Sequence, residues 1–79
     1  MKEFFVILRS VGNVKDFVTL ASVQPFDVTV GNDRQWVNGK NFMQMFCLNL
    51  NEPQQVRVDC SDEDFCGIFE ATERFRTEY

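Results

Sequence analysis

Spaced apolar residues divide the first half of the chain into a strand and a helix. The dense apolar run 4–8 is rich in strand formers and predicts the first strand. Helical spacing then predicts an amphipathic helix whose buried stripe contains Val14, Phe17, Val18 and Ala21. Asn13 with Asp16 three residues later is typical of a helix N-cap, and Pro25 ends the helix.

The second half of the chain predicts a hairpin, a short helix, a strand and a last helix. Strict alternation indicates a strand over 26–30, and turn residues at 31–33 lead to its partner strand over 34–38. A short helix follows over 41–48, and a last strand alternates from Val56 to Cys60. The last helix has apolar residues from Phe65 to Phe75 and a cap at Ser61, with Asp64, or at Asp62.

The resulting order of elements is βαββαβα. Alternating helices and strands that include at least one hairpin indicate an α+β fold rather than a purely parallel sheet. We predict one domain over residues 1–79, with three helices covering one face of a four-stranded sheet. We also expect the last helix to pack onto Val56 and Val58 through Phe65, Ile68 and Phe69.

Charge and hydropathy exclude several functional classes. The net charge of −4 argues against general nucleic-acid binding, which needs a basic face. Residues 59–79 contain seven acidic residues and two arginines, so the acidity gathers in a solvated face of the last element. No apolar run approaches the roughly 20 residues of a membrane span, and the first residues do not resemble a signal peptide. We therefore expect a soluble cytoplasmic protein that does not bind a membrane.

The reactive side chains offer little chemistry. The chain has no histidine, and its three cysteines, Cys47, Cys60 and Cys66, have no CxxC spacing. This inventory predicts no metal site and no cofactor. We expect buried, reduced thiols, with a Cys60–Cys66 disulfide as the alternative that the spacing permits.

Three segments in register resemble the HPr family, the histidine-containing phosphocarriers of the bacterial sugar phosphotransferase system. Residues 37–48 are similar to the family's V-x-x-K-S-I-M-x-x-M-x-L segment. Phe17-Val18 with Ala21-Ser22 is similar to F-V-x-x-A-S, and residues 27–30 to D-V-x-V. The resemblance implies an open-faced two-layer sandwich with an antiparallel sheet.

The resemblance also locates two functional positions, and neither has the residue type that can be phosphorylated in the family. The family's active-site loop, G-[IL]-H-A-R-P, corresponds to a shortened segment without histidine that contains Ser10, Val11, Gly12 and Asn13. The regulatory serine of Gram-positive members falls on Asn41, which can cap a helix but cannot be phosphorylated. We therefore expect no catalytic residue and no enzyme activity. Asp16 and Cys47 remain as alternative phosphoryl acceptors.

In the HPr family, the second helix and the start of the first helix form the docking face for partner proteins. The corresponding candidate binding residues here are Asn41, Phe42, Met43, Phe46 and Lys15. A helix of about two turns cannot bury all its apolar residues, so we expect Met45 in the core and at least one of Phe42, Met43 and Phe46 exposed. An anion contact at the first helix, near Arg9 and Lys15, would compete with its cap.

Three functional hypotheses follow. The first is a non-phosphorylatable HPr-like module that binds a protein of the phosphotransferase system or a regulator of carbohydrate metabolism. The second is a generic α+β interaction domain unrelated to phosphotransfer. The third is a phosphocarrier with a nucleophile other than histidine.

Overall fold

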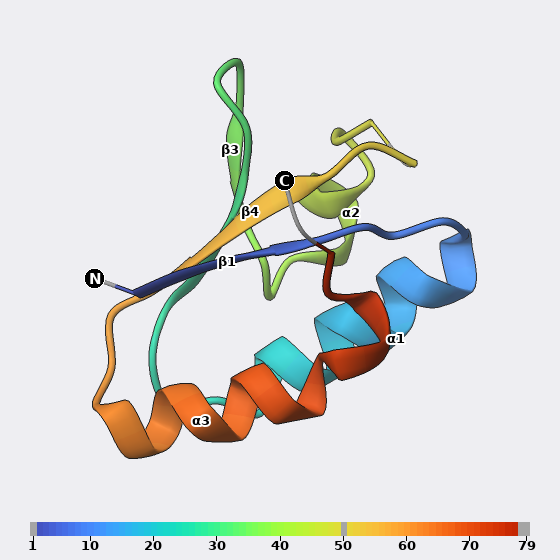
Figure 1. The fold of residues 1–79 in the computed structure, drawn as a ribbon. Coiled ribbons are helices and arrows are strands. Elements are labelled where there is room, and N and C mark those ends of the chain that lie inside the picture. Colours follow the sequence, from blue (N-terminus) through green and yellow to red (C-terminus); the bar gives the residue numbers. More distant parts are fainter. Residues whose placement is uncertain (1, 50, 78–79) are drawn as a thin grey trace.

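The four strands form one antiparallel sheet in the order β1-β4-β2-β3 (Figure 1). The computed structural model describes residues 2–49 and 51–77. Its elements are β1 (Lys2–Val6), α1 (Val11–Ser22), β2 (Val28–Gly31), β3 (Trp36–Asn38), α2 (Phe42–Met45), β4 (Gln54–Val58), α3 (Asp62–Ala71) and the 3₁₀ helix η1 (Glu73–Phe75). The predicted βαββαβα order is confirmed.

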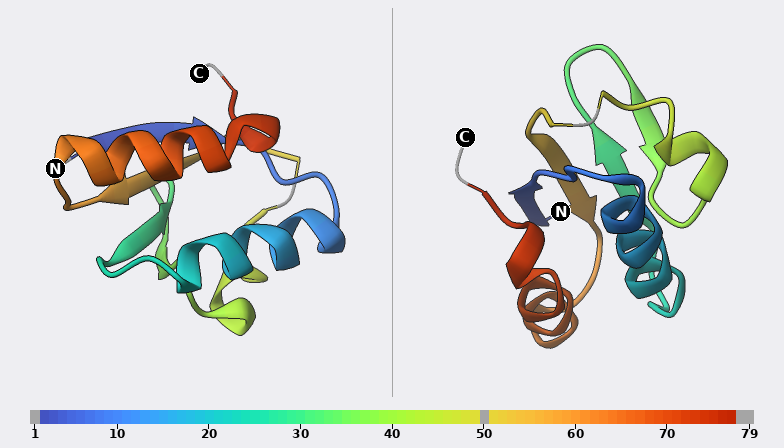
Figure 2. Two further views of the ribbon diagram at one scale, coloured as in Figure 1. Left: turned by 90° about the horizontal axis from the view of Figure 1, so that it is seen from below. Right: turned by 90° about the vertical axis from the view of Figure 1, so that its right-hand side faces the viewer.

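All three α-helices lie on one side of the sheet, which leaves the other side open (Figures 1 and 2). The right-hand view of Figure 2 shows α1 in the middle of the helical layer, with α3 on one flank and α2 on the other. Contacts link α1 to both neighbours. The structure therefore confirms the predicted open-faced α+β sandwich.

The core lies between the valines of the sheet and the inner faces of the helices. Alternation in β2 and β4 turns Val28, Val30, Val56 and Val58 towards the helices, and all four are buried. The main helical contributions are fully buried side chains from four elements: Phe17, Met45, Ile68 and Phe75. Phe17 and Phe75 meet edge to face, with ring centroids 6.3 Å apart.

The last helix contacts the sheet differently from our expectation. Ile68 is buried as predicted, but Phe65 and Phe69 are only partly buried. Their rings pack edge-on against Phe4 of β1, with centroids 5.8 and 5.6 Å away. The Arg76 guanidinium covers the Phe69 ring at 3.8 Å. The two aromatic rings thus close the rim of the core beside β1.

On the open side of the sheet, side chains from three strands stack into a row. The Arg57 guanidinium lies 4.1 Å from the Trp36 ring centroid, and its Nε donates to Glu3 at 2.6 Å. Trp36 lies so close to its cross-strand partner Gly31 that a Cβ there would meet the Gln35 carbonyl and the indole. Glycine at this position lets the indole lie against the sheet.

Hydrogen bonds cover parts of both edges of the sheet. At the outer edge of β1, Arg76 of the C-terminal segment forms an isolated bridge with Val6. At the outer edge of β3, the Gln44 side chain of α2 accepts a hydrogen bond from the Asn38 N–H at 2.9 Å. These contacts satisfy backbone groups that would otherwise face solvent.

Helix boundaries differ from the predicted ones at three places. Helix α1 begins at Val11 because Ser10, not Asn13, is its N-cap: the Ser10 hydroxyl accepts from the Asn13 N–H at 3.1 Å. Helix α2 ends at Met45 rather than at Leu48, although Asn41 caps it by accepting from the Gln44 N–H. The predicted cap of α3 at Ser61 is confirmed, but the helix ends at Ala71, and Phe75 lies in the 3₁₀ helix η1.

Replacement of Phe75 should test the core. Phe75→Ala removes a ring that is 1% exposed, so we expect the free energy of unfolding to fall by about 3–5 kcal/mol. Phe69→Ala should cost clearly less, because that ring is partly exposed. Urea denaturation of both variants measures the difference. Equal losses would contradict the described arrangement.

Replacing Gly31 or Gly67 by alanine should change the stability of the protein in opposite directions. Gly31→Ala places a Cβ against the Gln35 carbonyl and the Trp36 ring, so we expect a lower melting temperature and altered tryptophan fluorescence. Gly67→Ala, inside α3 with no atom within 4 Å of the new Cβ, should stabilise the protein by about 0.5–1 kcal/mol. A Gly31→Ala protein as stable as wild type would mean that the hairpin packs differently.

Candidate functional site

The N-terminus of α1 occupies the place where the resemblance locates an active-site loop. Ser10 caps the helix, and Val11, Gly12 and Asn13 form its first turn instead of a loop. Val11 is 57% exposed. No acidic residue lies in this first turn. Asp16, which we assigned to the cap, instead accepts from the Arg74 guanidinium at 2.8 Å.

Helix α2 presents apolar side chains to solvent. Met43 is 75% exposed and Phe46 is 39% exposed, whereas Met45 is fully buried. Phe42 is half-buried, and its ring meets that of Phe46 edge to face at 4.6 Å. Both expectations for this helix, a buried Met45 and at least one exposed apolar neighbour, are confirmed.

Helical spacing shows which flank of α1 faces α2. The sheet side of α1 contains buried residues such as Phe17, and Asp16 faces Arg74 at the α3 end of the molecule. Val11 and Lys15 lie four residues apart on the other flank. Helix α2 is the neighbour on that flank (Figure 2), so helical spacing puts both residues on the side of α1 where α2 lies.

We call Val11, Lys15, Met43 and Phe46 the α1–α2 face. It combines three exposed apolar side chains with an exposed lysine that belongs to none of the ion pairs among the described residues. Exposed apolar side chains on two neighbouring helices, with a charged residue among them, are suited to contact with another protein. Of the predicted binding residues, Asn41 serves as the cap of α2 and Phe42 packs partly inward.

The cysteines do not follow our expectation of buried thiols. Cys47 and Cys66 are exposed, Cys60 is half-buried, and all three are free. The Cys47 Sγ donates to the Met43 carbonyl at 3.9 Å. Burial raises the pKa of the Cys60 thiol. The positive charge of Lys2 lowers this pKa in part, and the carboxylate of Asp64 raises it further. Cys60 therefore stays protonated and is a poor nucleophile.

Comparison with known proteins supports the fold. No protein-family model matches the sequence, and neither does any curated protein. Among solved structures, the chain is similar to HPr-C-His from Thermoanaerobacter tengcongensis, with a TM-score of 0.72 and 20% sequence identity over 92% of each chain. At this identity the likeness shows a shared HPr-like fold.

Neither a metal-ligand cluster nor a membrane-spanning helix occurs in the part of the chain that the structure describes. Within residues 2–49 and 51–77, no group of three or more potential ligand side chains could hold a metal ion. In the same ranges, none of the helices combines the length and the hydropathy that a bilayer crossing requires.

Val11 is the residue of the α1–α2 face that the sequence analysis did not place correctly. It was assigned to a loop, because the helix start was placed at Asn13. Serine at position 10 is itself a strong capping signal, and a cap there makes Val11 the first residue of the helix. The capping serine is therefore the signal that places Val11 on α1.

The position of the cap can be tested directly. Ser10→Ala removes the side-chain acceptor of the Asn13 N–H, so we expect a loss of about 1 kcal/mol in the free energy of unfolding. Asn13→Ala keeps that backbone donor and should change the stability little. Thermal denaturation of the two variants gives the comparison. A larger loss for Asn13→Ala would restore Asn13 as the cap.

Proposed function

We propose that this protein is an HPr-like binding module that docks a protein partner through the α1–α2 face and carries no phosphoryl group. The partner would belong to the phosphoenolpyruvate-dependent sugar phosphotransferase system or regulate carbohydrate metabolism. The observation that carries this proposal is the exposure of Val11, Met43 and Phe46 around α1 and α2. Solvent exposure of these apolar groups has no structural benefit for an isolated domain.

The residues near the start of α1 support a role without phosphotransfer. A carrier needs a reactive linkage such as a phosphoramidate, and the chain has no imidazole. The Ser10 hydroxyl is positioned there, but it accepts the capping hydrogen bond, and a serine phosphate ester is too stable to pass its phosphoryl group on. Asn41 occupies the cap of α2 and has no hydroxyl to phosphorylate.

Charge further defines the expected partner. Lys15 lies on the α1–α2 face, and neither α1 nor α2 has an acidic residue in its first turn. The acidic first turn of α3, residues 62–64, is on the far flank of the helical layer (Figure 2). A partner with an apolar depression beside acidic groups would complement this face and would avoid repulsion from α3.

One observation favours the hypothesis of a carrier with another nucleophile, namely the exposure of Cys47. A cysteine nucleophile needs the thiolate form, which nearby basic groups or a helix N-terminus stabilise. Cys47 follows the C-terminal end of α2 rather than a helix N-terminus, and its Sγ donates a hydrogen bond to the Met43 carbonyl at 3.9 Å. We therefore keep the binding module as the proposal, with a generic interaction domain as its alternative.

The chemistry is tested by mixing the protein with phosphoenolpyruvate and the first enzyme of the phosphotransferase system. We expect no phosphoprotein, because no side chain replaces the histidine. Intact-mass measurement before and after acid treatment checks the result, and an authentic HPr is the positive control. An added phosphoryl group that disappears in the Cys47→Ser variant would establish the cysteine carrier instead.

The docking face is tested by comparing matched variants as bait for proteins of the source cell. Met43→Glu combined with Phe46→Ala places a charge and a small residue on the face, so a captured partner should be lost. Val23→Ala is the control, because Val23 is 74% exposed at the other end of α1. Capture that survives the double variant with unchanged affinity would refute docking at this face.

A further inference from the structure

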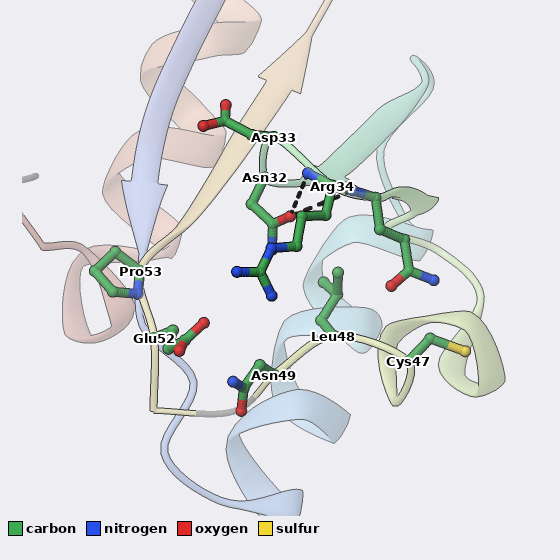
Figure 3. A pocket seen from close by; sticks show the side chains of 9 residues that line it. Asn32, Asp33, Arg34, Cys47, Leu48, Asn49, Glu52 and Pro53 are labelled. Carbon is green, nitrogen blue, oxygen red and sulfur yellow. Dashed lines mark hydrogen bonds between the residues drawn. The ribbon is translucent and has the colours of Figure 1, made fainter.

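A polar cleft separates the turn between β2 and β3 from the loop between α2 and β4 (Figure 3). Its volume is about 530 Å³, within the range of roughly 300–1,000 Å³ that is typical of small-molecule sites. The lining residues that matter here are Asn32, Arg34, Leu48, Asn49 and Glu52. These five residues supply one positive charge, one negative charge, one apolar side chain and two amides.

A buried side chain fixes the two walls of this cleft relative to one another. Gln54, at the start of β4, is 2% exposed. Its Oε1 accepts from the Asn32 amide of one wall at 3.1 Å, and its Nε2 donates to the Asn49 carbonyl of the other at 3.1 Å. A buried amide with these partners resists displacement, because each broken bond would leave a buried polar group unpaired.

The charges of Arg34 and Glu52 stand on opposite walls of the cleft. The guanidinium of Arg34 points into the cleft from the turn, while the carboxylate of Glu52 approaches from the loop (Figure 3). Neither residue takes part in the three ion pairs found among the described residues. Asp33, next to Arg34, also lines the cleft, and its carboxylate points away from the Arg34 guanidinium (Figure 3).

The backbone under Arg34 is also held in place. The Asn32 Oδ1 accepts from the Arg34 N–H at 2.9 Å and from the Gln35 N–H at 3.3 Å. Together with Gln54, this turn presents the guanidinium to the cleft from a fixed base. A separated cation and anion on fixed walls favour a ligand that has both charges itself, because a singly charged ligand would leave one wall unsatisfied.

We propose that this cleft binds a free α-amino acid as its zwitterion. The Arg34 guanidinium would bind the ligand carboxylate through parallel N–H donors, and the Glu52 carboxylate would accept from the ligand ammonium. The Asn49 amide offers a further polar contact, and the small accessible part of Leu48, which is 6% exposed, borders the space for the ligand side chain. The α1–α2 face takes no part in this site, so the inference does not rest on the proposed function.

The test uses three probes that differ only in charge: L-leucine, 4-methylpentanoate without the ammonium, and 3-methylbutylamine without the carboxylate. Each is titrated into the isotope-labelled full-length protein at neutral pH, and backbone amide shifts are followed by NMR. We expect saturable shifts at Arg34, Asn49 and Glu52 with leucine. The other two probes should bind about tenfold more weakly or worse, because each loses a hydrogen-bonded charge contact.

Two variants test whether Arg34 binds the ligand carboxylate and Glu52 binds the ligand ammonium. Arg34→Gln should weaken leucine binding to the level of 3-methylbutylamine, and Glu52→Gln should weaken it to the level of 4-methylpentanoate. Asp59→Asn is the charge-matched control: Asp59 is exposed and lies outside the cleft, so this variant should leave the affinity for leucine unchanged. The inference is overturned if leucine gives no saturable shifts at the cleft, if either singly charged probe binds as tightly as leucine, or if both variants keep the wild-type affinity.

Discussion

The alternation of valines in β2 and β4 is the constraint on which the other elements depend. It gives the sheet one apolar side, and a chain of 79 residues can cover only that side with helices. Helix α1 lies at the centre of the covering layer because it contributes Val14, Phe17 and Ala21, all buried. The lateral helices α2 and α3 each contribute one fully buried large side chain, Met45 and Ile68.

Regular patterns in the sequence were sufficient to predict the elements and their order. The spacing of Val14, Phe17 and Ala21 gave the buried side of α1, and the positions of Met43 and Met45 gave their opposite environments. These features are local, since they depend on residues within a few positions of each other. The comparison with a solved HPr structure supports the resulting fold.

Features that depend on distant residues, or on the side of a helix on which a residue lies, are harder to predict from the sequence. The exposure of Cys66 follows from its place two residues before the buried Ile68, which turns it to the opposite side of α3. Composition alone had suggested burial. The cleft could not be predicted, because Gln54 joins Asn32 across 22 residues of sequence. No local pattern distinguishes such a glutamine from an ordinary polar residue at the start of a strand.

The contacts along the sheet edges affect the kind of recognition that is open to this molecule. A partner that adds a strand to a sheet gains affinity from main-chain hydrogen bonds, which nearly any sequence can supply. Here Arg76 occupies the edge of β1 at Val6, and Gln44 occupies that of the three-residue strand β3 at Asn38. Little continuous edge is left for such promiscuous pairing. A partner of this molecule would therefore have to recognise its side chains, and single substitutions in that partner could abolish binding.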